Sequence, residues 1–200
     1  ENSIESTTEA TIDSVDTSAQ GNVALTASSS KVITAHDVAA SVDISGGSGS
    51  GSGTSVALTG AGASSTNTTN NFVLAIINNA EVTANAGGSV ALNATDSTAI
   101  SADVVAAALG ISVSSSGNGG SLDVAVTVAE NTITNTTRAV VMGGSTITAD
   151  GDFDAHASST GSITATGAAA SLSVGVNGGT VGLTGAGAGV GATNTIENTI

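Results

Sequence analysis

The sequence predicts an all-β protein, a repetitive parallel β-solenoid (β-helix) built from about three imperfect repeats of roughly 63–68 residues. Three observations predict it: apolar and polar residues alternate, similar segments recur along the chain, and none of the 200 residues is proline. Alternation with a period of two is the spacing of a β-strand. Proline cannot donate a backbone hydrogen bond, so its absence is typical of a chain whose backbone is paired over most of its length.

The repeat appears as sets of similar segments that recur in the same order. The matching segments are 15–27, 82–94 and, with a shorter turn, 147–157; then 33–35, 100–102 and 163–165; then 56–62 and 181–187; and finally three Asn/Thr-rich clusters at 67–71, 131–135 and 194–198. These matches divide the chain into repeats 1–70, 71–135 and 136–200 of one continuous solenoid. Residues 1–4 also resemble residues 197–200, so we expect the chain to be a fragment of a longer array.

Each expected strand places one set of side chains inside and the other outside. Val23, Leu25 and Ala27 share one face of their segment, opposite Ala24 and Thr26. The first segment carries an acidic residue at every fourth position: Glu1, Glu5, Glu9 and Asp13. On a helix these like charges would be neighbours and would repel one another. On a strand they lie outside, with Ile4, Ala10 and Ile12 inside, so we predict a strand here.

Glycine- and serine-rich stretches at 45–54 and 114–121 predict loops or wide turns between strands. The run Val104–Leu109 contains three consecutive alanines and leaves a helix as an alternative at this place. For the repeat as a whole, we expect three coils of about 21 residues. The spacing of eight to eleven residues between inward anchors also suits tandem antiparallel sandwiches.

The predicted core is thin because the chain is rich in small residues and contains only two phenylalanines. In a solenoid each strand pairs with the coils above and below at a spacing of about 4.8 Å, so backbone hydrogen bonds compensate for the missing bulk. Identical residues at equivalent positions, such as those of the Asn/Thr clusters, are expected to form hydrogen-bonded ladders. Phe153 takes the place of Val23 and Val90, while Ala155 takes the place of Leu25 and Leu92.

Composition excludes several classes of function. The net charge is −14, Trp and Tyr are absent, and Lys31 and Arg138 are the two basic residues other than histidine. Nucleic-acid binding is excluded because it needs basic residues for phosphates and aromatic platforms for bases. No cysteine is present, which excludes disulfides and zinc–cysteine sites. The longest apolar runs are far shorter than the roughly 20 residues that span a bilayer as a helix, so we expect no membrane insertion.

The densest group of potential ligands is the segment 150–156, in which Asp150, Asp152, Asp154 and His156 share one face of the expected strand. Three carboxylates in this arrangement, Asp150, Asp152 and Asp154, are a weak candidate for a calcium site. The alternative, which we favour, is a solvated acidic surface, because the other repeats do not carry the same residues. We expect no other cofactor. No combination of residues points to catalysis, so we expect that the protein is not an enzyme.

Several segments resemble the repeats of very large bacterial surface and secreted proteins of the filamentous-haemagglutinin-like and giant adhesin type. The resemblance rests on residues 88–94, 139–149 and 192–198. It implies a β-solenoid, an extracellular or cell-surface location, and a structural role in a stalk or filament whose partner is another copy of itself, end to end or lateral. The alternative is an adhesin-type module that binds glycans or surfaces through rows of Thr, Ser and Asn.

Overall fold

A computed structural model describes residues 1–47, 54–179 and 181–200 of the chain. These residues form ten β-strands and no helix, so the prediction of an all-β protein is confirmed. The strands are β1 (Asn2–Asp13), β2 (Thr17–Ala19), β3 (Val23–Gly47), β4 (Ser55–Asn78), β5 (Glu81–Ala84), β6 (Val90–Ser114), β7 (Gly119–Met142), β8 (Thr146–Ala149), β9 (Phe153–Asn177) and β10 (Gly182–Thr199). In this part of the chain there is accordingly no helix long and apolar enough to cross a membrane.

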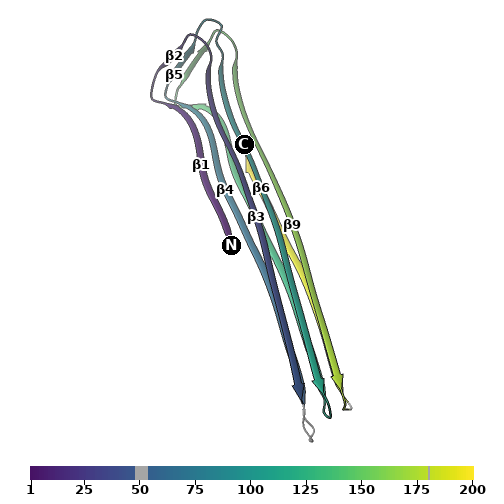
Figure 1. The fold of residues 1–200 in the computed structure, drawn as a ribbon. Helices are drawn as coiled ribbons and strands as arrows, with labels where there is room; N and C mark the ends of the chain where they lie inside the picture. The colour runs from purple at the N-terminus through teal and green to yellow at the C-terminus, as the bar shows by residue number, and fades with distance from the viewer. Residues whose placement is uncertain (48–53, 180) are drawn as a thin grey trace.

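The strands form three parallel sheets whose members come from successive repeats, which confirms the predicted parallel β-solenoid. One long sheet has the order β1-β4-β7-β10, the other has the order β3-β6-β9, and the short sheet β2-β5-β8 joins them at one end. Figure 1 shows the chain running down one long sheet, returning up the other and crossing the short sheet before the next coil. We call the end with the short sheet the cap end and the opposite end the far end.

Each repeat makes one coil, so the prediction of three coils of about 21 residues per repeat is wrong. Ile33 pairs with Ile100, and Ile100 with Ile163, which are separated by a whole repeat. The two long strands of the second coil have 25 and 24 residues. Together they take up most of one repeat, so the repeat is not long enough for three coils. The two alternatives are also wrong: neighbouring strands run parallel, which excludes antiparallel sandwiches, and residues 104–109 belong to β6 rather than to a helix.

The stacking register confirms most of the repeat alignment. Val23, Val90 and Phe153 occupy one row, and Asn67, Asn131 and Asn194 occupy another. The predicted loop 114–121 shrinks to residues 115–118 because the strands extend on both sides of it. In the other predicted loop, residues 45–47 belong to β3, and residues 48–53 lie outside the described part of the chain.

Three parts of the alignment are wrong by a few residues. Thr17, not Val15, pairs with Val82, because the cap turn of the first coil is shorter than that of the second. Val56 stacks through Gly120 on Leu183 rather than on Val181. Ile4 lies in the row of Thr69, Ile133 and Ile196, so the first residues are not in phase with residues 197–200. Side-chain similarity was in each case outweighed by continuous backbone pairing from the neighbouring rows.

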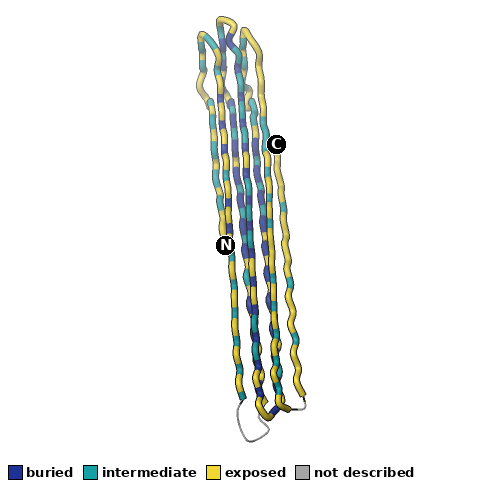
Figure 2. The backbone as a smooth tube through the Cα atoms, turned by 45° about the vertical axis from the view of Figure 1, so that its right-hand side comes forward, coloured by how far each residue is buried: buried dark blue, intermediate teal, exposed yellow. Residues whose placement is uncertain are grey.

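The interior changes character along the coil. At the cap end it is apolar, with Leu92, Val73 and Ile77 among the fully buried side chains. In the middle, buried asparagines lie next to Ile100 and Ile133. Toward the far end the interior consists mainly of alanine, glycine, serine and threonine, and Asp123 is also buried there. Burial is greatest in the second coil, which is covered by a coil on each side (Figure 2).

Candidate interaction surfaces

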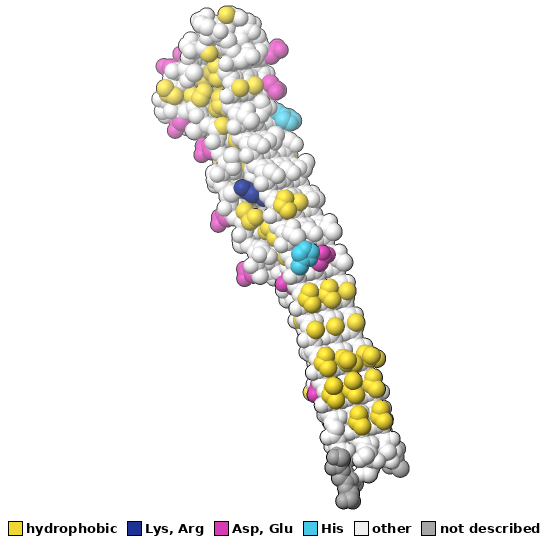
Figure 3. Space-filling view, viewed as in Figure 1, with side chains coloured by type: hydrophobic (Ala, Val, Ile, Leu, Met, Phe, Trp, Pro, Cys, Tyr) yellow, Lys and Arg dark blue, Asp and Glu magenta, His cyan; other side chains and the backbone are white. Residues whose placement is uncertain are grey.

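The outer face of the sheet β3-β6-β9 is apolar toward the far end, where the interior is composed of small and polar residues. We call this surface the apolar face. Its members stand in five transverse rows: Val38, Val105 and Ala168; Ala40, Ala107 and Ala170; Val42, Leu109 and Leu172; Ile44, Ile111 and Val174; and Gly46, Val113 and Val176. Figure 3 shows hydrophobic side chains gathered in rows across the lower part of these strands. Exposed fractions reach 77% at Val38 and 59% at Leu172, so the surface is open to solvent.

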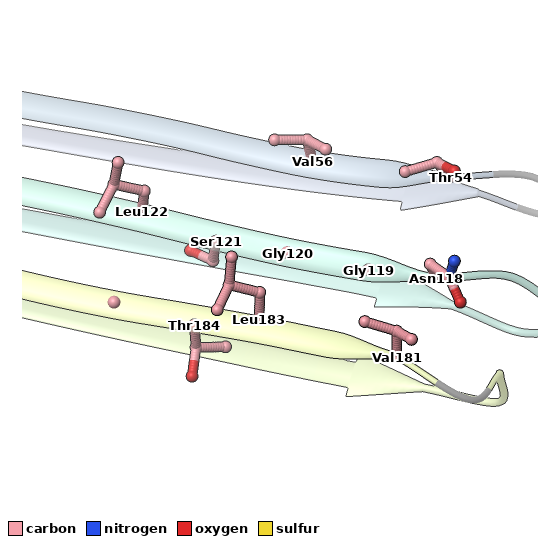
Figure 4. A pocket seen from close by; sticks show the side chains of 11 residues that line it. Thr54, Val56, Asn118, Gly119, Gly120, Ser121, Leu122, Val181, Leu183 and Thr184 are labelled. Carbon is pink, nitrogen blue, oxygen red and sulfur yellow. The ribbon is translucent and has the colours of Figure 1, made fainter.

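The outer face of the other long sheet, β1-β4-β7-β10, carries a second apolar surface, in which glycines lie beside larger side chains in the same row. Leu122, Val124 and Val126 are exposed on β7, between strands that place glycines beside the valines. Nearer the far end, Gly120 lies between Val56 and Leu183 in one row. The missing side chain leaves an open groove of about 400 Å³ that Val56, Leu122, Val181 and Leu183 line. Figure 4 shows these side chains around the bare backbone of Gly119 and Gly120.

The far-end interior leaves no room for larger side chains, which explains why the apolar residues face outward. A Cβ atom at Gly110 would lie 2.1 Å from Asp123 Oδ1 and 2.5 Å from Ser121 Oγ on the opposite sheet. Asp123 is fully buried and accepts a hydrogen bond of 3.0 Å from the Ser121 hydroxyl. A Cβ at Gly167 would similarly meet Val190 Cγ1 at 2.3 Å. The two long sheets therefore approach closely here, over glycine and alanine.

The middle of the coil holds the asparagine ladder that the sequence predicts. The amide of Asn2 donates to Asn67, Asn67 donates to Asn131, and Asn131 donates to Asn194, at 2.8, 2.8 and 2.9 Å. A second ladder runs from Ser6 through Asn71 to Asn135. These bonds join side chains at the same level of successive coils, so they hold the coils in register.

Asp96 lies inside the solenoid next to the second ladder. Its Oδ2 accepts hydrogen bonds from Asn135 Nδ2 at 2.7 Å and from Thr98 Oγ1 at 3.0 Å. Burial raises the pKa of this carboxyl above its ordinary value, and the Thr98 hydrogen bond and the positive charge of Lys31 oppose that rise only in part. The folded environment of Asp96 thus disfavours the charged form of its carboxyl group.

The three aspartates of the predicted weak calcium site lie around the turn between β8 and β9. Asp150 and Asp152 belong to the turn, and Asp154 lies on the outer face of β9; all three are exposed. Asp150 Oδ2 accepts a hydrogen bond from the backbone of Gly87 at 3.5 Å. In the described part of the chain no group of three or more His, Cys, Asp or Glu side chains is placed to hold a metal ion.

Both histidines, His36 and His156, lie on the outer face of the β3-β6-β9 sheet. His36 Nδ1 lies 3.2 Å from Asp103 Oδ2, and both side chains are well exposed. An exposed pair of this kind contributes little to stability. His156 stacks on Asn93 in the row that begins at Thr26, so this polar row changes residue type at every coil. Toward the cap end the outer rows are hydroxyl- and amide-rich but mixed.

Sequence reasoning missed the apolar face, although a signal for it was present. From Val104 to Ser114, one set of alternating residues comprises alanine, glycine and serine after Val104, and the other comprises valine, leucine, isoleucine and alanine. An expectation that the bulkier set points inward assigns the wrong face. Side-chain volume indicates the correct face. Two sheets that lie close enough to pack over glycine leave no space between them for leucine.

Comparison of this chain with models of protein families, with curated proteins and with solved structures finds no match.

Proposed function

We propose that this chain is a structural repeat segment of a stalk or filament of the bacterial cell surface or matrix. In this segment, successive coils stack by pairing the strands at their sheet edges. The observation that carries the proposal is the in-register ladder of Asn2, Asn67, Asn131 and Asn194 through successive coils. A row that repeats the same hydrogen bond at each coil extends to further coils without any new kind of contact. The location at the cell surface is supported by the sequence resemblance alone.

The open edges of the long sheets support growth along the stacking axis. β3 pairs with β6 on one side, and β9 pairs with β6 on the other, so within the described residues each of these 25-residue strands has one unpaired edge. Unpaired backbone N–H and C=O groups are a template for a further strand. A coil that continues the array would pair all of them.

The adhesin alternative assigns glycan or surface binding to the polar rows near the cap end. The row of Thr26, Asn93 and His156 varies from coil to coil, and a repetitive ligand would be bound more uniformly by a row of identical residues. We therefore favour the structural role.

A tandem fusion tests whether the coils form an extendable array. Because Asn2 lies at the level of Asn194, residues 1–192 followed directly by residues 1–200 continue the register into a second set of coils. We expect this in-register fusion to unfold in a single transition, at a higher midpoint temperature than the 200-residue chain, since nearest-neighbour contacts between coils dominate the stability of repeat proteins. Thermal denaturation followed by circular dichroism measures both properties.

The matched control joins residues 1–200 to a second copy of residues 1–200, which displaces the register by eight residues at the junction. This control is expected to unfold at the temperature of the single chain, as two independent units. If the in-register fusion behaves like the control, the coils do not add to one another and the proposal is wrong.

A further inference from the structure

We propose that the apolar face binds the apolar face of a second copy of this chain, with the two copies antiparallel and overlapping only over their far ends. This lateral contact goes beyond the stacking of coils proposed above, because it uses the outer surface of a sheet rather than its edges. The relief of the face points to a second copy as the occupant, the distribution of charge sets the orientation of the two copies, and the area sets the strength of the contact.

The relief of the apolar face is self-complementary. A row of three alanines, Ala40, Ala107 and Ala170, lies beside the larger row of Val42, Leu109 and Leu172. The alanine row forms a shallow furrow and the leucine row forms a ridge. Sheets that pack face to face lie about 10 Å apart with interdigitating side chains. A second copy supplies both a ridge and a furrow at the matching spacing.

The distribution of charge sets the relative orientation of the two copies. No charged side chain points outward from the apolar face: Asp37 and Asp43 are at inward positions of β3, and Asp123 is buried in the facing sheet. The exposed acidic residues of the β1, cap and β9 segments all lie toward the cap end. Parallel copies would place these acidic regions side by side, and antiparallel copies carry them apart. Repulsion between like charges therefore favours the antiparallel arrangement.

The area of the apolar face predicts how strong this contact is. Rows spanning about 30 Å on three strands about 4.8 Å apart cover about 430 Å² per copy, or about 860 Å² in a dimer. Stable interfaces bury about 1,200–2,000 Å², so three coils give a weak, concentration-dependent dimer. The area increases in proportion to the number of coils, so six coils reach the range of a stable interface.

The test uses the 200-residue chain, analysed by sedimentation equilibrium and solution X-ray scattering. We expect a monomer–dimer equilibrium in which the dimer is populated only at high protein concentration, because the interface is smaller than those of stable complexes. Ammonium sulfate should strengthen the dimer, because it favours burial of apolar surface. The antiparallel dimer should have a maximum dimension about one and a half times that of the monomer, whereas a parallel dimer would keep the length of the monomer.

Two matched double variants assign the contact to the apolar face. Leu109→Asp with Leu172→Asp places charges in the ridge and should weaken dimerization at least 100-fold. Ser101→Asp with Thr164→Asp adds the same charges to an outward row of the same two strands nearer the cap end, and should leave dimerization within about threefold of the wild type. Circular dichroism confirms that each variant is folded, as expected for substitutions at outward positions.

Three results would overturn the proposal: a monomer at millimolar concentration in ammonium sulfate, a dimer as short as the monomer, or equal weakening by the two double variants. Flotation of the wild type, but not of the leucine variant, with phosphatidylcholine vesicles in place of dimerization would also overturn it by assigning the face to lipid. None of these outcomes depends on the tandem fusion, so this proposal and the proposed function are tested separately.

Discussion

At the scale of single residues, Asp96 is the group that makes stability depend on pH in an unusual direction. Burial raises its pKa, so the folded protein holds the Asp96 proton more tightly than the unfolded chain does. Its contribution to stability is therefore fully present below the ordinary value of 3.8 and is lost as the pH rises through the raised pKa. A buried carboxyl with a lowered pKa would do the opposite.

The variant Asp96→Asn tests this direction. Asparagine retains an oxygen to accept from Asn135 and Thr98 but carries no charge to desolvate. We expect the variant to have a higher midpoint temperature than the wild type at pH 7 and a similar one at pH 3, measured by thermal denaturation across this pH range. The exposed Asp154→Asn is the control and should follow the wild-type profile. A variant less stable than the wild type at pH 7 would contradict the argument.

Asn131 shows what one rung of the ladder contributes. It is 1% exposed, accepts from Asn67 and donates to Asn194, so Asn131→Ala removes two hydrogen bonds and leaves a buried Asn67 amide group without that partner. We expect a loss of about 2–4 kcal/mol in the free energy of unfolding, measured by urea denaturation. Asn194→Ala, in the exposed last coil, removes one bond and should cost about 1 kcal/mol or less. Equal costs would mean that burial of the ladder is unimportant.

At the scale of the strand, the bulky residues of the alternating pattern point inward in one half of β6 and outward in the other half. In the cap half of β6, Val90 and Leu92 point inward; in its far half, Leu109 and Ile111 point outward. The strand has no bulge between them, because its pairing with β9 is continuous from Val90 to Ser114. The same alternate positions point inward along the whole strand. The bulky residues occupy the inward positions in the cap half and the outward positions in the far half. The separation between the two sheets follows the volume of the inward set.

Gly110 tests this relation between the sheets. Gly110→Ala brings a methyl group against Asp123 and Ser121 of the facing sheet, and we expect a loss of about 1–3 kcal/mol in urea denaturation, as for other overpacked cores. Gly62→Ala is the control, since a Cβ there has no neighbour within 4 Å. Adding Asp123→Ala to Gly110→Ala should recover at least half of the loss. No recovery would show that the cost arises elsewhere than at this contact.

At the scale of the whole molecule, the length of the coil determines the shape of any array. Strands of 25 residues span about 80 Å, whereas each further coil adds about 4.8 Å along the stacking axis. The described protein is therefore longest along its strands (Figure 1). An array would accordingly be a broad ribbon rather than a thin rod. In electron micrographs, the in-register fusion should keep the strand-wise length of the single chain and double its thickness. Three short coils per repeat would have produced a narrow and longer filament.

The repeat, the strand period, the absence of proline and the identity of most stacking rows follow from the residues themselves, because each depends on neighbours along the chain or on equivalent positions in the next repeat. The Asn67, Asn131 and Asn194 row is an example: like residues at a constant spacing predict a ladder in any parallel stack. Register shifts of a few residues, as at Val56 and Leu183, could not be predicted from the sequence. At these positions the similar side chains do not stack on one another, because the backbone pairing continues in the register of the neighbouring rows.

The residue pattern predicts parallel coils that repeat in register, because a chain of small alternating residues without proline obtains its stability chiefly from backbone pairing between repeats. Two features follow only from packing between distant parts of the chain: each repeat is a single long coil, and Leu109 and its neighbours face solvent. Both depend on the distance between two sheets that meet across the interior, and that distance is set by contacts such as Gly110 with Asp123, which no local pattern contains.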